Sequence, residues 1–153
     1  IKAMSTQVLG DWHWVKTPSE QEKSEYNEMC MILMIKLKGK SLREHTENEL
    51  NNVAEFLDAI IKLIESYPQE QMFKKDAKKM LILRMKTNYL LHHYNKAEKD
   101  CLSILRMLEA EKESFAHYDE KYGGIGALLG AGESLNKEIE NVKNLLDEIR
   151  SHF

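Results

Sequence analysis

The sequence predicts an all-α protein, a single-domain antiparallel bundle of about five helices preceded by an extended N-terminal arm. Three observations lead to this prediction. Apolar residues recur three and four positions apart over most of the chain, which is the period of an amphipathic helix. No segment alternates between apolar and polar residues as a strand of any length would. Glycine and proline, which interrupt helices, are few, and five of the seven glycines fall between positions 123 and 132.

Residues 1–16 form the predicted arm, and residues 17–153 form the predicted helical domain. The arm contains Trp12 and Trp14, whose alternation suits an extended chain with both indoles on one side. These tryptophans either pack on the bundle or present an aromatic anchor to a partner, as tryptophan often does.

The first two helices have clear start signals and continuous apolar stripes. Thr17 is a candidate cap for the first helix, with Pro18 at its first position, and Gly39 suits its end. The second helix starts at either of two capping boxes, Ser41 with Glu44 or Thr46 with Glu49, and stops before Pro68. The two stripes are Tyr26, Met29, Cys30, Leu33 and Leu37, and Leu50, Val53, Leu57, Ile60, Ile61 and Ile64.

The next two helices are expected to fold back on each other at the centre of the domain. The third spans Gln69 to His92 and is apolar on nearly every side from Met80 to Met85, which is typical of a buried helix. Asn95 is the predicted turn residue. The fourth helix carries Ala97, Cys101, Ile104, Leu105 and Leu108 and runs as far as Ala116.

The last helix is predicted to begin at Ser134, as a cap, with the stripe Leu135, Ile139, Val142, Leu145, Leu146 and Ile149. The glycine-rich segment before it does not match a phosphate-binding loop. From Gly130 the sequence reads GAGESLNK, with Asn136 where that motif requires lysine, and no strand precedes it.

The stretch LILRMKTNYLLHHYNKAEKDCLSIL resembles one tetratricopeptide-type helical hairpin. Tyr94, Ala97 and Cys101 match around the turn, whereas Met85 replaces the expected small residue and Tyr89 sits one position off. No copy recurs at a 34-residue period, as an array of such repeats requires. The resemblance therefore implies a helical hairpin of that shape and not a peptide-binding array.

Composition excludes several classes of protein and leaves binding as the expected function. A net charge of −3 gives no overall field that would favour nucleic acid or an anionic membrane. The two cysteines fall on apolar helix faces, which favours reduced thiols in a cytoplasmic, soluble protein over a disulfide. Histidines lack the spacing of metal ligands. We expect no cofactor, no metal and no membrane insertion.

The favoured function is a non-enzymatic protein–protein interaction module, an adaptor, regulatory or assembly subunit that offers a helical face or groove to another protein or peptide. The expected contact residues are Trp12, Trp14, Lys75, Lys79, Lys86 and His93. The alternative is a domain that acts on nucleic acid. It would either bind through the basic stripe of the third helix or cleave RNA with Arg84 and His92, in the manner of HEPN-type helical ribonucleases. The spacing of Arg84 and His92 differs from the motif of that family. The sequence leaves self-association open.

Overall fold

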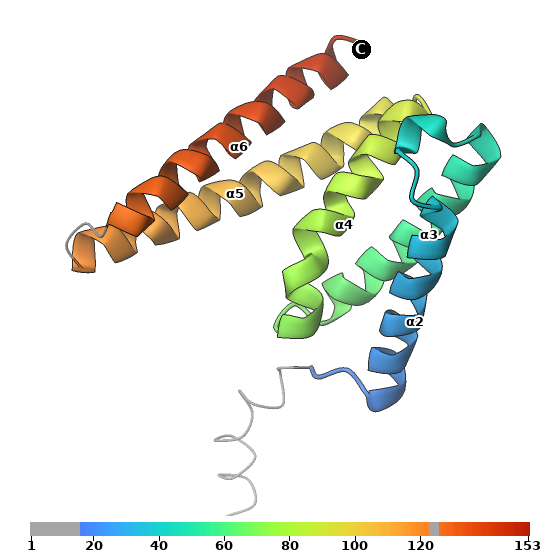
Figure 1. Cartoon of the computed structure of the whole chain (residues 1–153), viewed down its shortest axis with the longest axis horizontal. Coiled ribbons are helices and arrows are strands. Elements are labelled where there is room, and N and C mark those ends of the chain that lie inside the picture. The colour runs from blue at the N-terminus through green and yellow to red at the C-terminus, as the bar shows by residue number, and fades with distance from the viewer. Residues whose placement is uncertain (1–15, 123–125) are drawn as a thin grey trace, which may run out of the picture.

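The computed structural model describes residues 16–122 and 126–153, and these ranges are helical without any strand (Figure 1). The helices are α2 (Glu20–Leu37), the short 3₁₀ helix η1 (Leu42–Glu44), α3 (Glu47–Ser66), α4 (Gln71–Leu90), α5 (Tyr94–Tyr122) and α6 (Gly126–Arg150). Each long helix packs against the next one along the chain, and η1 also contacts α4. The predicted all-α fold with five long helices is confirmed.

The helices form a row in chain order, and α4 joins its two halves. Buried apolar residues fall into one cluster shared by α2, α3 and α4 and a second shared by α4, α5 and α6. Met80 belongs to the first cluster and Met85 to the second, while Leu81 packs against both. The central position predicted for the third helix is therefore correct.

The prediction that the whole of Met80–Met85 is buried is too broad. The two methionines are 6% and 2% exposed, but the four residues between them are only half-buried. The reason lies in the row arrangement, since a helix flanked on two sides keeps part of its surface open.

Capping boxes fix the starts of three helices. Ser19, rather than Thr17, caps α2: its hydroxyl accepts from the Glu22 amide at 3.1 Å, and its own amide donates to the Glu22 carboxylate at 3.0 Å. The predicted cap was thus two residues early. Ser41 opens η1 and Thr46 opens α3, so both of the alternatives weighed for the second helix form.

Other predicted boundaries also differ from the structure. The third helix, expected over Gln69–His92, is α4 at Gln71–Leu90, and the fourth, expected to run as far as Ala116, continues as α5 to Tyr122. His92, not Asn95, makes the turn between α4 and α5 with a left-handed φ of 64°, and Asn95 lies inside α5. Histidine tolerates this conformation better than most residues, and its Nδ1 lies 2.7 Å from the Tyr94 hydroxyl. Ser134 is not a cap either, because α6 already begins at Gly126.

Candidate functional site

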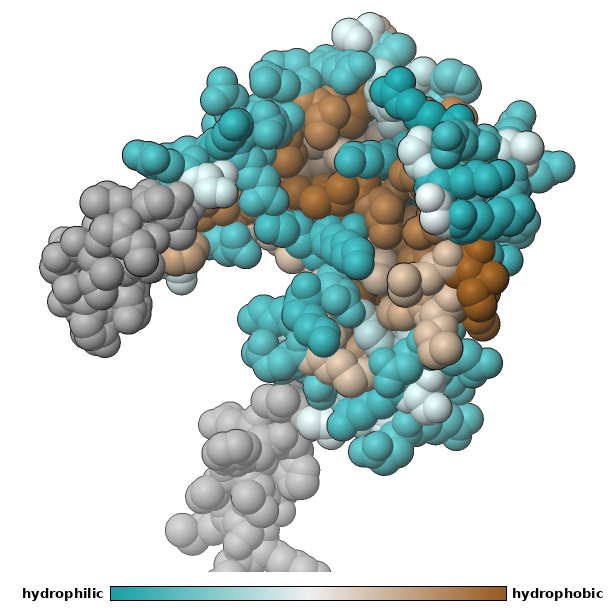
Figure 2. All heavy atoms as spheres, in the orientation of Figure 1, coloured by the Kyte–Doolittle hydropathy of each residue, from teal (hydrophilic) through white to brown (hydrophobic). Residues whose placement is uncertain are grey.

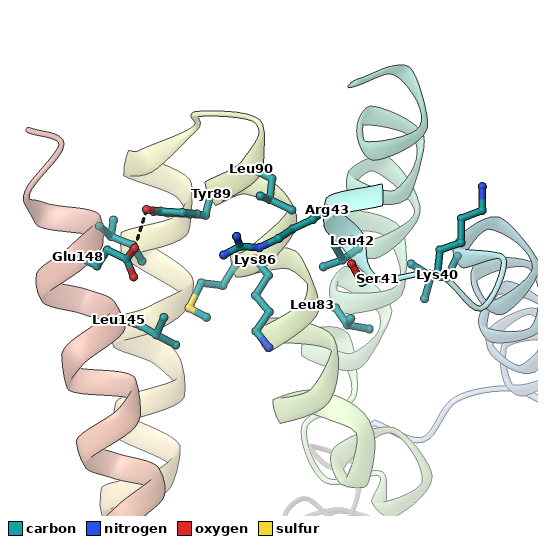
Figure 3. Close-up of a pocket in the computed structure, with 13 residues that line it drawn as sticks. Lys40, Ser41, Leu42, Arg43, Leu83, Lys86, Tyr89, Leu90, Leu145 and Glu148 are labelled. Carbon is teal, nitrogen blue, oxygen red and sulfur yellow. Dashed lines mark hydrogen bonds between the residues drawn. The ribbon is translucent and has the colours of Figure 1, made fainter. Parts of the chain in front are cut away.

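A groove of about 490 Å³ lies between η1, α4 and α6 (Figure 3). The capping box of Ser41 and Glu44 shapes η1, which contacts α4. On the other side, α6 reaches α4 through the hydroxyl of Tyr89, which donates to the Glu148 carboxylate at 3.1 Å. Three segments that are distant in the sequence therefore build one concave surface.

The lining of the groove is largely apolar. Leu83 and Leu90 of α4 are half-buried there, and Met85 lies beneath them as part of the core. Figure 2 shows hydrophobic surface in the hollow over α4 with hydrophilic side chains around it. Such partly exposed apolar surface is stabilised when another apolar surface covers it. The apolar lining comprises Leu37, Leu42, Leu83, Met85, Leu90, Leu145 and Ile149.

The charged residues of the groove are mainly cations. Lys40, Arg43 and Lys86 line it, with Glu148 as the single carboxylate. Within the described ranges none of these three cations forms an ion pair, whereas Lys38 pairs with Glu49 and Lys78 with Glu138. Figure 3 shows Arg43 and Lys86 reaching into the same space from η1 and α4. Carboxylates are the natural counter-charges for such a rim.

An aromatic cluster surrounds Tyr89, which lines the groove. His152 stacks on Tyr94 with ring centroids 4.2 Å apart, and its Nε2 lies 3.2 Å from the hydroxyl of Tyr89. Burial, and then the hydrogen bond to Glu148, raise the pKa of Tyr89. The cluster fastens the end of α6 to the turn between α4 and α5.

The structure separates the predicted contact residues. Lys86 lines the groove, while Lys75 and Lys79 are exposed on earlier turns of α4 and do not line it. His93 is exposed in the turn between α4 and α5. The predicted arm, with Trp12 and Trp14, lies outside the described residues.

Arg84 and His92, the pair considered for RNA cleavage, have separate partners. The guanidinium of Arg84 donates to Asp100 at 2.7 and 2.8 Å and to Asp58 at 3.0 Å. His92 lies against the hydroxyl of Tyr94. Arg84 therefore ties α3, α4 and α5 together, which is a structural role.

Sequence reasoning missed Lys40 and Arg43 as site residues. The capping box of Ser41 and Glu44 was visible, but nothing in the order of residues places η1 opposite Lys86. The only available signal was the surplus of lysine and arginine between Lys36 and Arg43, with no carboxylate among them.

Three further observations concern membrane spans, metal-ligating side chains and similarity to known proteins. No helix in the described ranges is long and apolar enough to span a membrane. The same residues contain no group of three or more metal-ligating side chains. Comparison with protein-family models, with curated proteins and with solved structures finds no match for this chain.

Proposed function

We propose that this protein is a protein–protein interaction domain that receives an apolar, acidic segment of a partner in the groove between η1, α4 and α6. The observation that carries the proposal is the combination of an apolar lining with three cations that lack an ion pair within the described residues. Both properties are needed, because the apolar lining supplies affinity and the charges select the partner.

The size of the groove suits a peptide segment more than a whole protein surface. Its volume of about 490 Å³ accommodates a few large side chains. An amphipathic helix that places apolar residues at i, i+3 or i+4, and i+7 fills such a groove. Acidic residues on the flanks of that helix would meet Lys40, Arg43 and Lys86, which supports an acidic partner.

A nucleic acid is the less suitable ligand for this surface. Phosphate groups could meet the same cations. However, seven apolar side chains line the groove, and phosphates and riboses offer them little apolar surface. Among the lining residues, the ring of Tyr89 and the guanidinium of Arg43 are the planar groups on which a base could stack.

The test is a selection of helical peptides from a random phage-displayed library on the full chain, followed by fluorescence anisotropy with the selected peptides. The groove variant carries Arg43→Glu with Lys86→Glu. The matched control carries Lys75→Glu with Lys79→Glu, which makes the same change in charge on exposed residues outside the groove. We expect acidic amphipathic peptides, and a loss of about tenfold or more in affinity for the groove variant alone.

Two results would overturn the proposal. One is a set of peptides that bind the groove variant and the control equally well. The other is an absence of selected peptides together with binding of a single-stranded RNA probe at low salt that is lost in the groove variant, which would favour the nucleic-acid alternative. Circular dichroism of each variant checks that the helices remain folded.

A further inference from the structure

A second groove, of about 390 Å³, lies between α2 and α3, which pack side by side (Figure 1). The half-buried side chains of Met29, Ile32 and Phe56 form most of its apolar lining. No residue that lines the groove between η1, α4 and α6 also lines this one. Apolar surface continues beyond it, since Ile35 follows Ile32 by three positions on α2 and is 71% exposed. Such surface is stabilised when another apolar surface covers it.

The charged residues that line this second groove are all carboxylates. Glu25, Glu28 and Glu55 are exposed around the apolar lining. In the part of the chain that the structure describes, none of the three forms an ion pair, although Glu25 accepts a hydrogen bond from the side chain of Gln21 at 3.3 Å. Their charge is opposite in sign to that of the three cations in the first groove. We call this second surface the acidic groove.

We propose that the acidic groove binds a basic amphipathic helix of another protein, so that the domain has two docking surfaces of opposite charge. The apolar side of such a helix would cover Met29, Ile32 and Phe56, and its lysines or arginines would pair with the three carboxylates. Charge complementarity identifies the occupant. The same carboxylates repel nucleic acid and anionic membrane surfaces, which carry negative charge themselves.

The ring of Phe56 already attracts a cation. The ammonium of Lys36 lies 4.9 Å from the centroid of this ring, which is a cation–π contact. Lys36 forms no ion pair with the carboxylates of the acidic groove, and one cation beside three carboxylates leaves the groove negative. A lysine or arginine of a partner therefore finds both an apolar surface for its stem and a carboxylate for its charge.

Selection from a phage-displayed library of helical peptides tests the charge of the partner. Every peptide carries leucine at positions i, i+3, i+4 and i+7, and the remaining positions are randomised among lysine, glutamate and alanine. The full chain is the target, and fluorescence anisotropy then measures the affinity of each selected peptide. We expect a class of lysine-rich peptides in addition to the acidic class that the first groove would select.

Charge-reversal variants assign the lysine-rich peptides to their surface. The acidic-groove variant carries Glu28→Lys with Glu55→Lys. The matched control carries Glu65→Lys with Glu140→Lys, which makes the same change in charge on exposed residues outside both grooves. We expect a loss of about tenfold or more in affinity for the acidic-groove variant alone. Circular dichroism checks that each variant is folded.

A third variant separates docking in the groove from diffuse attraction between charges. Ile32→Gln keeps all three carboxylates and makes the lining more polar. It should weaken the lysine-rich peptides about tenfold, because their leucines lose an apolar surface. Unchanged affinity in this variant would show that the peptides are held by charge alone, which would overturn the proposal.

Other results would overturn it as well. One is a selection that yields no lysine-rich peptides, and another is equal affinity of such peptides for the acidic-groove variant and its control. A dimer in sedimentation equilibrium that is lost in the acidic-groove variant would show that a second copy of the chain occupies the groove instead. These outcomes are independent of the first groove, because Arg43→Glu with Lys86→Glu leaves every residue of the acidic groove in place and should retain the lysine-rich peptides.

Discussion

Arg84 and Asp100 form a two-point ion pair between α4 and α5, with nitrogen–oxygen distances of 2.7 and 2.8 Å. Asp100 is only 3% exposed, and Asp58 of α3 holds the third edge of the same guanidinium at 3.0 Å. The pair lies where the two apolar clusters meet on α4, so it fixes the register of three consecutive helices.

Asp100→Ala should lower the free energy of unfolding by about 3 kcal/mol, because it leaves the half-buried guanidinium of Arg84 without its main partner. Urea denaturation followed by circular dichroism measures the loss. The double variant Arg84→Met with Asp100→Leu should recover most of it, since an apolar pair leaves no uncompensated charge. A double variant less stable than Asp100→Ala would contradict this account.

Leu57→Ala and Leu83→Ala should differ in cost although both remove the same atoms. Leu57 is fully buried in the first apolar cluster, so its truncation should cost about 2–5 kcal/mol. Leu83 is half-buried in the groove, and its truncation should cost about 1 kcal/mol because water already reaches part of the side chain. Equal losses in urea denaturation would mean that Leu83 belongs to the core.

The contrast between Leu57 and Leu83 shows how much of the fold can be predicted from the sequence. The stripe of α3 was predicted residue by residue, and all six of its members are buried, because α3 is amphipathic and has a helix on each side. The stretch from Met80 to Met85 has no polar face apart from Arg84, so its pattern could not show which side stays open. Of the four half-buried residues in this stretch, Leu83 lines the groove.

At the helix ends, neighbouring residues favoured different boundaries. Pro18 favoured a start at Thr17, while the capping box of Ser19 and Glu22 forms instead. His92 adopts the left-handed conformation that was expected at Asn95, and the ring of His92 lies against Tyr94. The groove itself could not be predicted, since Arg43, Lys86 and Glu148 come together only through packing of η1, α4 and α6.

The two cysteines should differ in their reactivity toward a thiol reagent. Both are free, as the sequence indicated, and they lie in different apolar clusters. Cys101 is fully buried, and burial raises its pKa to about 11, so roughly a hundredfold less thiolate is present than at the ordinary value of 9.0. Cys30 is half-buried, and burial also raises its pKa.

Mass spectrometry after a short exposure to iodoacetamide at pH 8 should therefore find the first label on Cys30. Cys101 should react only after urea unfolds the protein. The variant Cys30→Ser serves as the control and should remain unlabelled while folded. Rapid labelling of Cys101 in that folded variant would show that α5 and α6 open readily, contrary to their close packing.

Protonation of Glu49 should lower the stability of the protein in acid. The hydrogen bond from Lys38, then those from the Thr46 backbone and hydroxyl, lower the pKa of Glu49 from 4.5 to about 2. A carboxyl with a depressed pKa contributes stability that is fully present above its unfolded value. This contribution should therefore be lost progressively as the pH falls from about 4.5 to about 2.

Glu49→Gln removes this titration, so its free energy of unfolding should fall less steeply than that of the wild type across the same pH range. At pH 7 the variant should be the less stable of the two, because the ionised form holds Lys38 and the Thr46 amide more strongly. Glu47→Gln is the matched control, since Glu47 occupies the same first turn of α3 without a side-chain partner in the described residues. Urea denaturation at a series of pH values measures all three proteins. If Glu49→Gln and Glu47→Gln followed the same curve as the wild type, the capping box and the ion pair would not govern the acid stability of this junction.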